Sequence, residues 1–194
     1  MDAIRIISGI ILFLSLTGNM TGAKKGLKAA VSQYKEKPKT YLQKMPPNIS
    51  ALILLLIVLG IFGIGTISLD NKYIIYRVIG LFLFGLGSYL QIYSFKAMGD
   101  SYSQEIIIFN KHKLVTNGIY RYLRHPQYLF QIISDLGAAV ALSSYLVLII
   151  VLLAEIPLFF LRAKLEENLL ARHFASEYEE YKRKAGFLLP KWGK

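Results

Sequence analysis

Residues 116–128 read T-N-G-I-Y-R-Y-L-R-H-P-Q-Y, and this stretch marks the place where a polar segment enters an apolar one. It contains the turn signal Asn117-Gly118, and it places His125 directly before Pro126. A residue before proline is biased away from the helical conformation, whereas proline suits the first position of a helix. The stretch therefore predicts a helix that begins at Pro126 with His125 as its cap. The free N–H groups of that helix would face a binding surface at a membrane boundary.

The composition predicts an all-α integral membrane protein. Of the 194 residues, 54% are hydrophobic and only 18% are charged, whereas soluble domains are about one quarter charged. The apolar residues form runs of about 20, the length that crosses the hydrocarbon core of a bilayer. In such a protein a net charge of +11 indicates topology and attraction to anionic lipid rather than nucleic-acid binding. The chain has no cysteine and only three scattered histidines, so no metal site is expected.

Apolar runs and their flanking turn residues predict about five transmembrane helices. A cleaved signal peptide is the competing interpretation of the first run. We expect one integrated domain in which residues 1–98 hold three helices and a basic cytoplasmic connector, and residues 99–194 form the catalytic, cofactor-binding region. The five predicted helices are Ile4–Met20, Ile49–Ser68, Tyr73–Met98, Pro126–Leu142 and Tyr145–Leu161.

Two polar segments separate or follow these helices. Gly99–His125 is too long for a simple connector, and within it Ile106–Phe109 and Lys113–Val115 are predicted to pair as short strands. The stretch from Arg162 to Lys184 is charged and amphipathic, which predicts a further helix. We expect the cofactor pocket to lie between these two segments.

The distribution of basic residues predicts the topology. With five helices, 20 of the 23 lysines and arginines fall on one side of the membrane. The positive-inside rule then places both polar segments in the cytoplasm and the N-terminus outside. The Ser143-Ser144 turn makes the fourth and fifth helices antiparallel neighbours, which brings His125 close to Arg162.

Residues 162–167 read R-A-K-L-E-E, and this motif carries the strongest chemical signal of the C-terminal half. Positions four apart share one face of a helix, so Arg162 and Glu166 are neighbours, with Glu167 further round. An ordinary salt bridge is the simpler interpretation. Charges at membrane depth are nevertheless candidates for function. For Glu155 and Asp135, inside the predicted helices, packing and functional roles both remain open.

Several motifs together resemble the isoprenylcysteine carboxyl methyltransferase family of membrane enzymes. The resemblance covers residues 104–184, and the helices N-terminal to these residues hold no motif that supports it. The matching residues are H-K-L-V at 112–115, T-N-G-I-Y at 116–120, R-H-P-Q-Y at 124–128, R-x-x-x-E-E at 162–167 and E-Y-E-E-Y-K-R at 177–183.

The resemblance implies a function and a set of site residues. It implies an S-adenosylmethionine-dependent enzyme that forms a methyl ester on a prenylated cysteine or a similar lipophilic carboxylate, in a small molecule or a peptide held in membrane lipid. It implies that Arg162, Glu166 and Glu167 are catalytic, with Arg162 on the substrate carboxylate. The implied cofactor-binding residues are Gln104, His112, Lys113, Leu114, Val115, Tyr120, His125, Pro126, Gln127, Tyr128 and Glu166.

The residue types suit this chemistry independently of the resemblance to the family. A helix N-terminus with His125 suits the cofactor carboxylate, and the rings of Tyr120 and Tyr128 can stabilise a sulfonium cation. An acceptor carboxylate is ionised at neutral pH and needs alignment and exclusion of water rather than a general base. Two enzymatic alternatives stay open, a phospholipid or amine N-methyltransferase and a sterol-type NADPH reductase, together with a non-catalytic lipid-binding protein. The oligomeric state and the physiological acceptor are left open.

Overall fold

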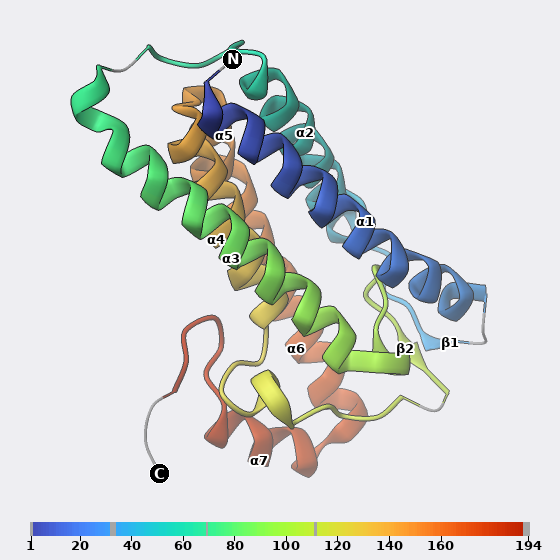
Figure 1. The fold of residues 1–194 in the computed structure, drawn as a ribbon. Coiled ribbons are helices and arrows are strands. Elements are labelled where there is room, and N and C mark those ends of the chain that lie inside the picture. Colours follow the sequence, from blue (N-terminus) through green and yellow to red (C-terminus); the bar gives the residue numbers. More distant parts are fainter. Residues whose placement is uncertain (1, 32–33, 69, 111, 192–194) are drawn as a thin grey trace.

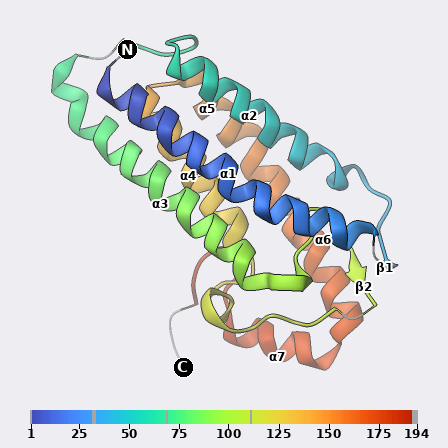
Figure 2. The ribbon, with the colours of Figure 1, turned by 45° about the vertical axis from the view of Figure 1, so that its right-hand side comes forward.

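The computed structural model describes residues 2–31, 34–68, 70–110 and 112–191, and it shows a bundle of long helices with a polar cap at one end (Figure 1). Four helical segments of the described chain are long and apolar enough to cross a membrane. In both views the N-terminus lies at one end of the bundle, and the short α7 lies at the other (Figures 1 and 2). The four candidate spans are Ala3–Met20, Tyr41–Ile61, Ile74–Met98 and Tyr145–Phe174.

The fourth predicted helix forms with the expected bounds but lies inside the bundle. α4 spans Pro126–Leu142, and its 17 residues make it shorter than the four candidate spans. His125 occupies its N-cap position and Pro126 its first turn, as predicted. The helix ends at Ser143, whose left-handed backbone (φ 52°) breaks the hydrogen-bond ladder.

The first two helices differ from prediction in their bounds. α1 spans Ala3–Val31, and thus runs well past the predicted end at Met20. Hydropathy marks only the part that crosses lipid, and no proline follows until Pro38 to end the helix. α2 spans Met45–Ile61 instead of the predicted Ile49–Ser68. Its two prolines fit in the first turn, and the left-handed Gly63 (φ 88°) follows its end.

α3 and α4 form the closest helix pair, because glycines remove the side chains between them. α3 spans Ile74–Met98. A Cβ atom added at Gly87 would lie 2.6 Å from the backbone nitrogen of Ser134, and one at Gly80 would lie 2.6 Å from that of Ala141. The apolar core beside this pair is contributed by α2 to α6, and its fully buried members include Ile53, Ile57, Phe84, Ala138, Leu142, Val147 and Val151.

We expect Gly87→Ala to lower the stability of the protein by about 1–3 kcal/mol, because the added methyl group must push two helix backbones apart. Thermal unfolding in one detergent at one pH would measure this loss. The matched control is Gly85→Ala on the same helix, where a Cβ would lie an ordinary 3.6 Å from the Ile11 side chain. Equal melting temperatures for the two variants would show that close approach at Gly87 is not needed.

The fifth predicted helix continues into the first part of the amphipathic segment as one helix that contains a π-helical turn. α5 (Tyr145–Ile150) leads through a π-helical turn at Val151–Glu155 into α6 (Ile156–Phe174). Pro157 lacks an N–H group and would clash with a carbonyl in a regular helix, and the wider turn removes that conflict. α7 (Ser176–Lys184) follows a break at Ala175, whose φ is 46°.

The predicted strand pair is wrong. β2 (Ile108–Phe109) pairs antiparallel with β1 (Tyr34–Glu36) from the connector after α1, not with Lys113–Val115. Short 3-10 turns complete the chain at Tyr41–Gln43, Asn71–Tyr73, Gly99–Ser101 and Gly118–Arg121. The pairing connects the segment after α1 to the polar segment. Both strands lie toward the end of the bundle where α7 lies (Figure 2).

Candidate active site

Arg162, Glu166 and Tyr128 form a buried cluster between α4 and α6. The predicted pairing of Arg162 with Glu166 is present, with Nε 3.4 Å from Oε1. The hydroxyl of Tyr128 lies between them: it accepts a hydrogen bond from Arg162 Nε at 2.8 Å and donates one to the Glu166 carboxylate. Arg162 is 5% exposed and Tyr128 is 7% exposed. A buried charge pair of this kind is stable only when further hydrogen bonds satisfy both partners.

Arg162 has further partners that the sequence did not predict. Its terminal nitrogens donate to the carbonyl oxygen of Leu42, at 3.3 Å, and to that of Gln104. Three of its five N–H donors are thereby engaged. The side chain therefore connects the 3-10 turn before α2 and the polar segment to α6, in addition to its pairing with Glu166.

His125 and Arg124 form further charge interactions beside this cluster. The imidazole of His125 lies between two carboxylates, with Nδ1 3.5 Å from Glu166 Oε2 and Nε2 3.5 Å from Glu167 Oε1. Its side chain makes no hydrogen bond to the N-terminus of α4, so His125 has the position of a cap without the contact. Arg124 Nε donates to Glu167 Oε1 at 2.5 Å, which gives Glu167 a charge partner outside the cluster.

The charges around His125 favour its protonated form. Burial by itself lowers the pKa of His125, but the carboxylates of Glu166 and Glu167 outweigh it, and the pKa is raised above its ordinary value. His112 is the opposite case, because burial and the neighbouring His173 lower its pKa to about 4. At neutral pH the imidazole of His112 is therefore neutral, whereas the surroundings of His125 favour its cationic form.

We expect the stability contributed by His125 to fall as pH rises. A group with a raised pKa in the folded state contributes its full stabilisation below its unfolded pKa, about 6.5, and loses it as pH rises through the folded value. Melting temperatures of the wild type and of His125→Gln, recorded from about pH 6 to pH 9, would measure this. The difference between the two proteins should shrink with rising pH, and a difference independent of pH would contradict the charge assignment.

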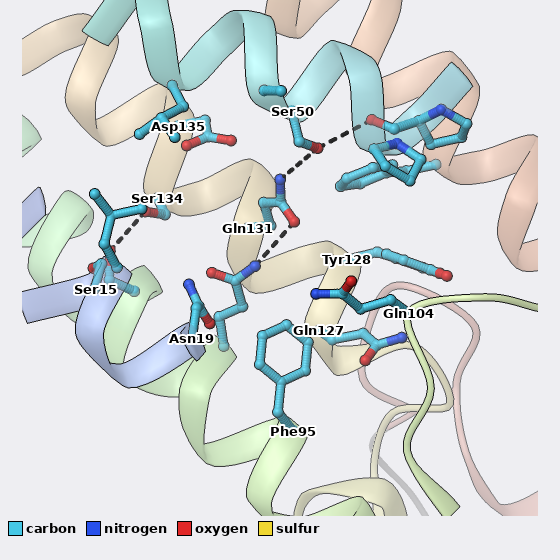
Figure 3. A pocket seen from close by; sticks show the side chains of 18 of the residues that line it. Ser15, Asn19, Ser50, Phe95, Gln104, Gln127, Tyr128, Gln131, Ser134 and Asp135 are labelled. Carbon is cyan, nitrogen blue, oxygen red and sulfur yellow. Dashed lines mark hydrogen bonds between the residues drawn. The ribbon is translucent and has the colours of Figure 1, made fainter. Parts of the chain in front are cut away.

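A large cavity opens on one side of the cluster, at the depth of the membrane-spanning helices (Figure 3). Its volume is about 400 Å³, and side chains from α1, α2, α3, α4 and α6 line it. Arg162 and Tyr128 form part of its wall, together with the predicted residues Gln104 and Gln127. Figure 3 shows Gln104, Gln127 and Tyr128 close together at one part of the wall. A cavity of this volume can hold an apolar chain whose polar end reaches Arg162.

A second, smaller cavity of about 60 Å³ lies on the other side of the cluster. Most of the predicted cofactor-binding residues meet here, although they come from separate segments. Tyr178 and Tyr181 of α7 also line it, and sequence reasoning missed both. Their i, i+3 spacing in the quoted E-Y-E-E-Y-K-R motif was the available signal. The predicted residues on this cavity are His112, Lys113, Leu114, Val115, Tyr120, His125, Gln127 and Glu166.

Several buried polar atoms around the small cavity lack a hydrogen-bond partner within the described parts of the chain. They are His112 Nδ1, His125 Nε2, Gln127 Oε1 and Tyr178 Oη. Native proteins rarely leave such atoms unpaired, because each unpaired group costs about 1–3 kcal/mol. Four of them around one space fit a polar ligand.

The remaining predicted residues line neither cavity. Pro126 begins α4 and is buried, and Glu167 pairs with Arg124. Gln127 lines both cavities. Tyr128, Arg162, Glu166 and His125 thus stand between a large membrane-depth cavity and a small polar one.

Comparison with known proteins identifies related sequences and a related fold. A family model described as phospholipid methyltransferase matches residues 75–177. The protein-S-isoprenylcysteine O-methyltransferase of Schizosaccharomyces pombe is 32% identical over 120 residues, which are 60% of this chain and 50% of the relative. That of Saccharomyces cerevisiae is 33% identical over 115 residues, 58% of this chain and 48% of the relative. The chain spans about half the length of these two relatives.

A solved structure supports the fold. The eukaryotic intramembrane Ras methyltransferase ICMT, solved without a monobody, superposes with a TM-score of 0.58 at 23% sequence identity. The match covers 74% of this chain and 52% of that one. The helical membrane architecture described above is therefore one that a solved membrane protein adopts.

Proposed function

Because the chain belongs to the phospholipid methyltransferase family, we propose that it transfers a methyl group from S-adenosylmethionine to the carboxylate of a prenylated cysteine or a similar lipophilic acid. The observation that carries this proposal is the position of Arg162. Its guanidinium group forms part of the wall of the large cavity, where the polar end of a lipophilic acceptor would lie. Relatives named protein-S-isoprenylcysteine O-methyltransferase support the choice of acceptor.

The residues around the small cavity fit S-adenosylmethionine in their chemistry. The unpaired atoms of His112, His125, Gln127 and Tyr178 offer hydrogen-bond donors and acceptors for its amino-acid and nucleoside groups. The cavity of about 60 Å³ is too small for a whole nucleoside, so we expect the 99–125 segment to move outward on binding. When bound, the cofactor supplies an electrophilic methyl group on a sulfonium centre.

The side chains of this protein would then align the acceptor and keep water away. The acceptor carboxylate is already ionised at neutral pH, so the site does not need to remove a proton. Arg162 has two N–H donors beyond those it gives to Tyr128, Leu42 and Gln104, and these can hold the carboxylate. Glu166 and Tyr128 fix the guanidinium group in position, which favours a reactive geometry.

One observation favours a second function, methylation of a lipid amine. The charge of Arg162 is already paired with Glu166, and the wall of the large cavity carries the carboxyl group of Asp135. An acidic wall suits a cationic amine better than an anionic acceptor. The two functions differ in the product, because a methyl ester is labile in base and a methylamine is stable.

The test of the proposed function uses the purified protein in lipid nanodiscs with methyl-labelled S-adenosylmethionine. Farnesylated cysteine and phosphatidylethanolamine are offered separately as acceptors, and product is scored before and after treatment with base. We expect base-labile label on farnesylated cysteine. Label that resists base on the lipid amine would favour the second function. Titration calorimetry with S-adenosylhomocysteine and NADPH would separate methyl transfer from the reductase alternative.

We further propose that the end of the bundle with both cavity-lining polar segments faces the cytoplasm, as the 20-to-3 distribution of basic residues favours. Because the chain has no cysteine, a single introduced cysteine reports its own accessibility. Asn117 and Ser68 are both exposed, and they lie in the polar segment and beyond the end of α2 respectively. An impermeant maleimide on intact cells should label Ser68→Cys and spare Asn117→Cys, and the reverse pattern would overturn the orientation.

A further inference from the structure

The wall of the large cavity carries a polar strip that a hydrocarbon tail does not need. On α4, the residues Gln127, Gln131 and Asp135 follow one another at intervals of four, so they share one face of the helix. All three line the cavity. Figure 3 shows Ser15 and Asn19 of α1 and Ser50 of α2 around this strip. Further polar residues of the wall include Ser88 and Gln91 of α3 and Ser134 of α4.

Both N–H donors of Gln131 are already used within the protein. Gln91 Nε2 donates to Gln131 Oε1 at 2.9 Å. Gln131 Nε2 in turn donates to Ser50 Oγ at 2.8 Å and to Glu155 Oε1 at 3.1 Å. The hydroxyl of Ser50 donates to the carbonyl oxygen of Pro46 at 3.2 Å. Gln131 therefore has no donor left to offer a ligand.

Two acceptor atoms on or behind this wall lack a hydrogen-bond partner in the described chain. They are Asn19 Oδ1, on a residue that lines the cavity, and Glu155 Oε2, on a residue that does not line it. Glu155 is completely buried, and its carboxyl group interacts with that of Asp135, which is 8% exposed. Even if these two carboxyl groups share one proton, they have more acceptor sites than donors. Buried acceptors without a donor are costly at membrane depth.

We propose that the methylated substrate carries a hydrogen-bond donor on its lipophilic tail, and that the carboxyl group of Asp135, which lines the cavity with the buried Glu155 beside it, selects for this donor. The substrate class is thus a lipophilic carboxylate with a hydroxyl or amino group part-way along the tail, rather than a plain isoprenoid. Asp135 follows Tyr128 by seven residues, so the donor lies about 10 Å along α4 from the end of the cavity at Arg162. This inference rests on the proposed methyl transfer.

The experiment compares matched acceptors with the full-length protein in nanodiscs. Three geranylated cysteine analogues are used: one with a plain chain, one with a hydroxyl group and one with an amino group, each placed part-way along the chain at about 10 Å from the carboxylate. The wild-type protein should methylate at least one of the two donor-bearing analogues with a kcat/KM at least about tenfold above that of the plain analogue, because a site built for a donor discriminates against its absence. Comparison of the hydroxyl analogue with the amino analogue then identifies which donor is bound.

Two isosteric variants locate the selection. Asp135→Asn and Glu155→Gln convert acceptors into amides with donors, so each should reduce the preference toward unity. Asp70→Asn is the matched control, because Asp70 lies outside the cavity, exposed and paired with Lys72 at 3.2 Å. The control should retain the wild-type preference.

The outcomes separate this inference from the function on which it rests. Equal kcat/KM values for all three analogues in the wild type would overturn the inference and leave the methyl transfer standing. Failure to methylate any of the three would instead overturn the carboxyl methyltransferase proposal. The ratio of kcat/KM values between the donor-bearing and plain analogues in the wild type tests the inference by itself. Poor folding of either variant therefore does not prevent a decision.

Discussion

Replacing Arg162 by alanine should lower turnover of a lipophilic carboxylate by about 30-fold or more while S-adenosylhomocysteine still binds. An aligned charged contact in a dry site contributes roughly 2–5 kcal/mol, and each 1.4 kcal/mol is about tenfold in rate. Arg162→Lys should remain badly impaired, because a point charge cannot reproduce the planar contact with Tyr128 on one side and the acceptor on the other. Labelled methyl transfer and calorimetry measure the two effects.

The structure adds a control and a complication to this prediction. Arg172 is on the same helix, but its side chain is 64% exposed and pairs with Glu36, so Arg172→Ala should retain turnover. Arg162 also holds the carbonyl oxygens of Leu42 and Gln104, so Arg162→Ala is expected to melt at a lower temperature as well. Near-normal turnover by Arg162→Ala would remove the acceptor site from Arg162 and favour the amine methyltransferase.

Replacing Glu166 by glutamine should show the opposite pattern, with weaker cofactor binding as the main effect. Glu166 lines the small cavity and accepts from Tyr128, and it neutralises the charges of Arg162 and His125. Loss of a charge-assisted hydrogen bond costs about 1.5–3 kcal/mol, so the Kd of S-adenosylhomocysteine should rise by roughly 10- to 100-fold. Glu180→Gln on α7 is the control, since Glu180 is exposed and paired only with Lys184 at 2.5 Å among the contacts of the described chain.

A double-mutant cycle distinguishes a catalytic pair from a structural one. If Arg162 and Glu166 serve only to pair with each other, both single variants lose stability and the double variant is no worse than either. If they serve acceptor and cofactor separately, the losses in turnover and in affinity should combine in the double variant. An unchanged Kd in Glu166→Gln would contradict its place in the cofactor site.

The sequence determined the local features of this protein, because these depend on residues close together in the chain. Pro126 and the Ser143-Ser144 turn fixed α4 at its predicted bounds. The spacing of Arg162 and Glu166 fixed their shared face, and the motifs identified a resemblance to the isoprenylcysteine carboxyl methyltransferases that the relatives confirm. Helix periodicity and capping are set within a few residues, so a sequence can be read for them directly.

Only the tertiary structure decided which distant side chains meet. Arg162 proved to be fastened to the Leu42 and Gln104 carbonyls, and Glu155 proved to join Asp135 through the network around Gln131. These contacts depend on the depth at which helices pack, which the glycines of α3 and the π turn before α6 set. No local pattern records the position of one helix along another, and that position leaves a large cavity and a small one on either side of the cluster of Tyr128, Arg162 and Glu166.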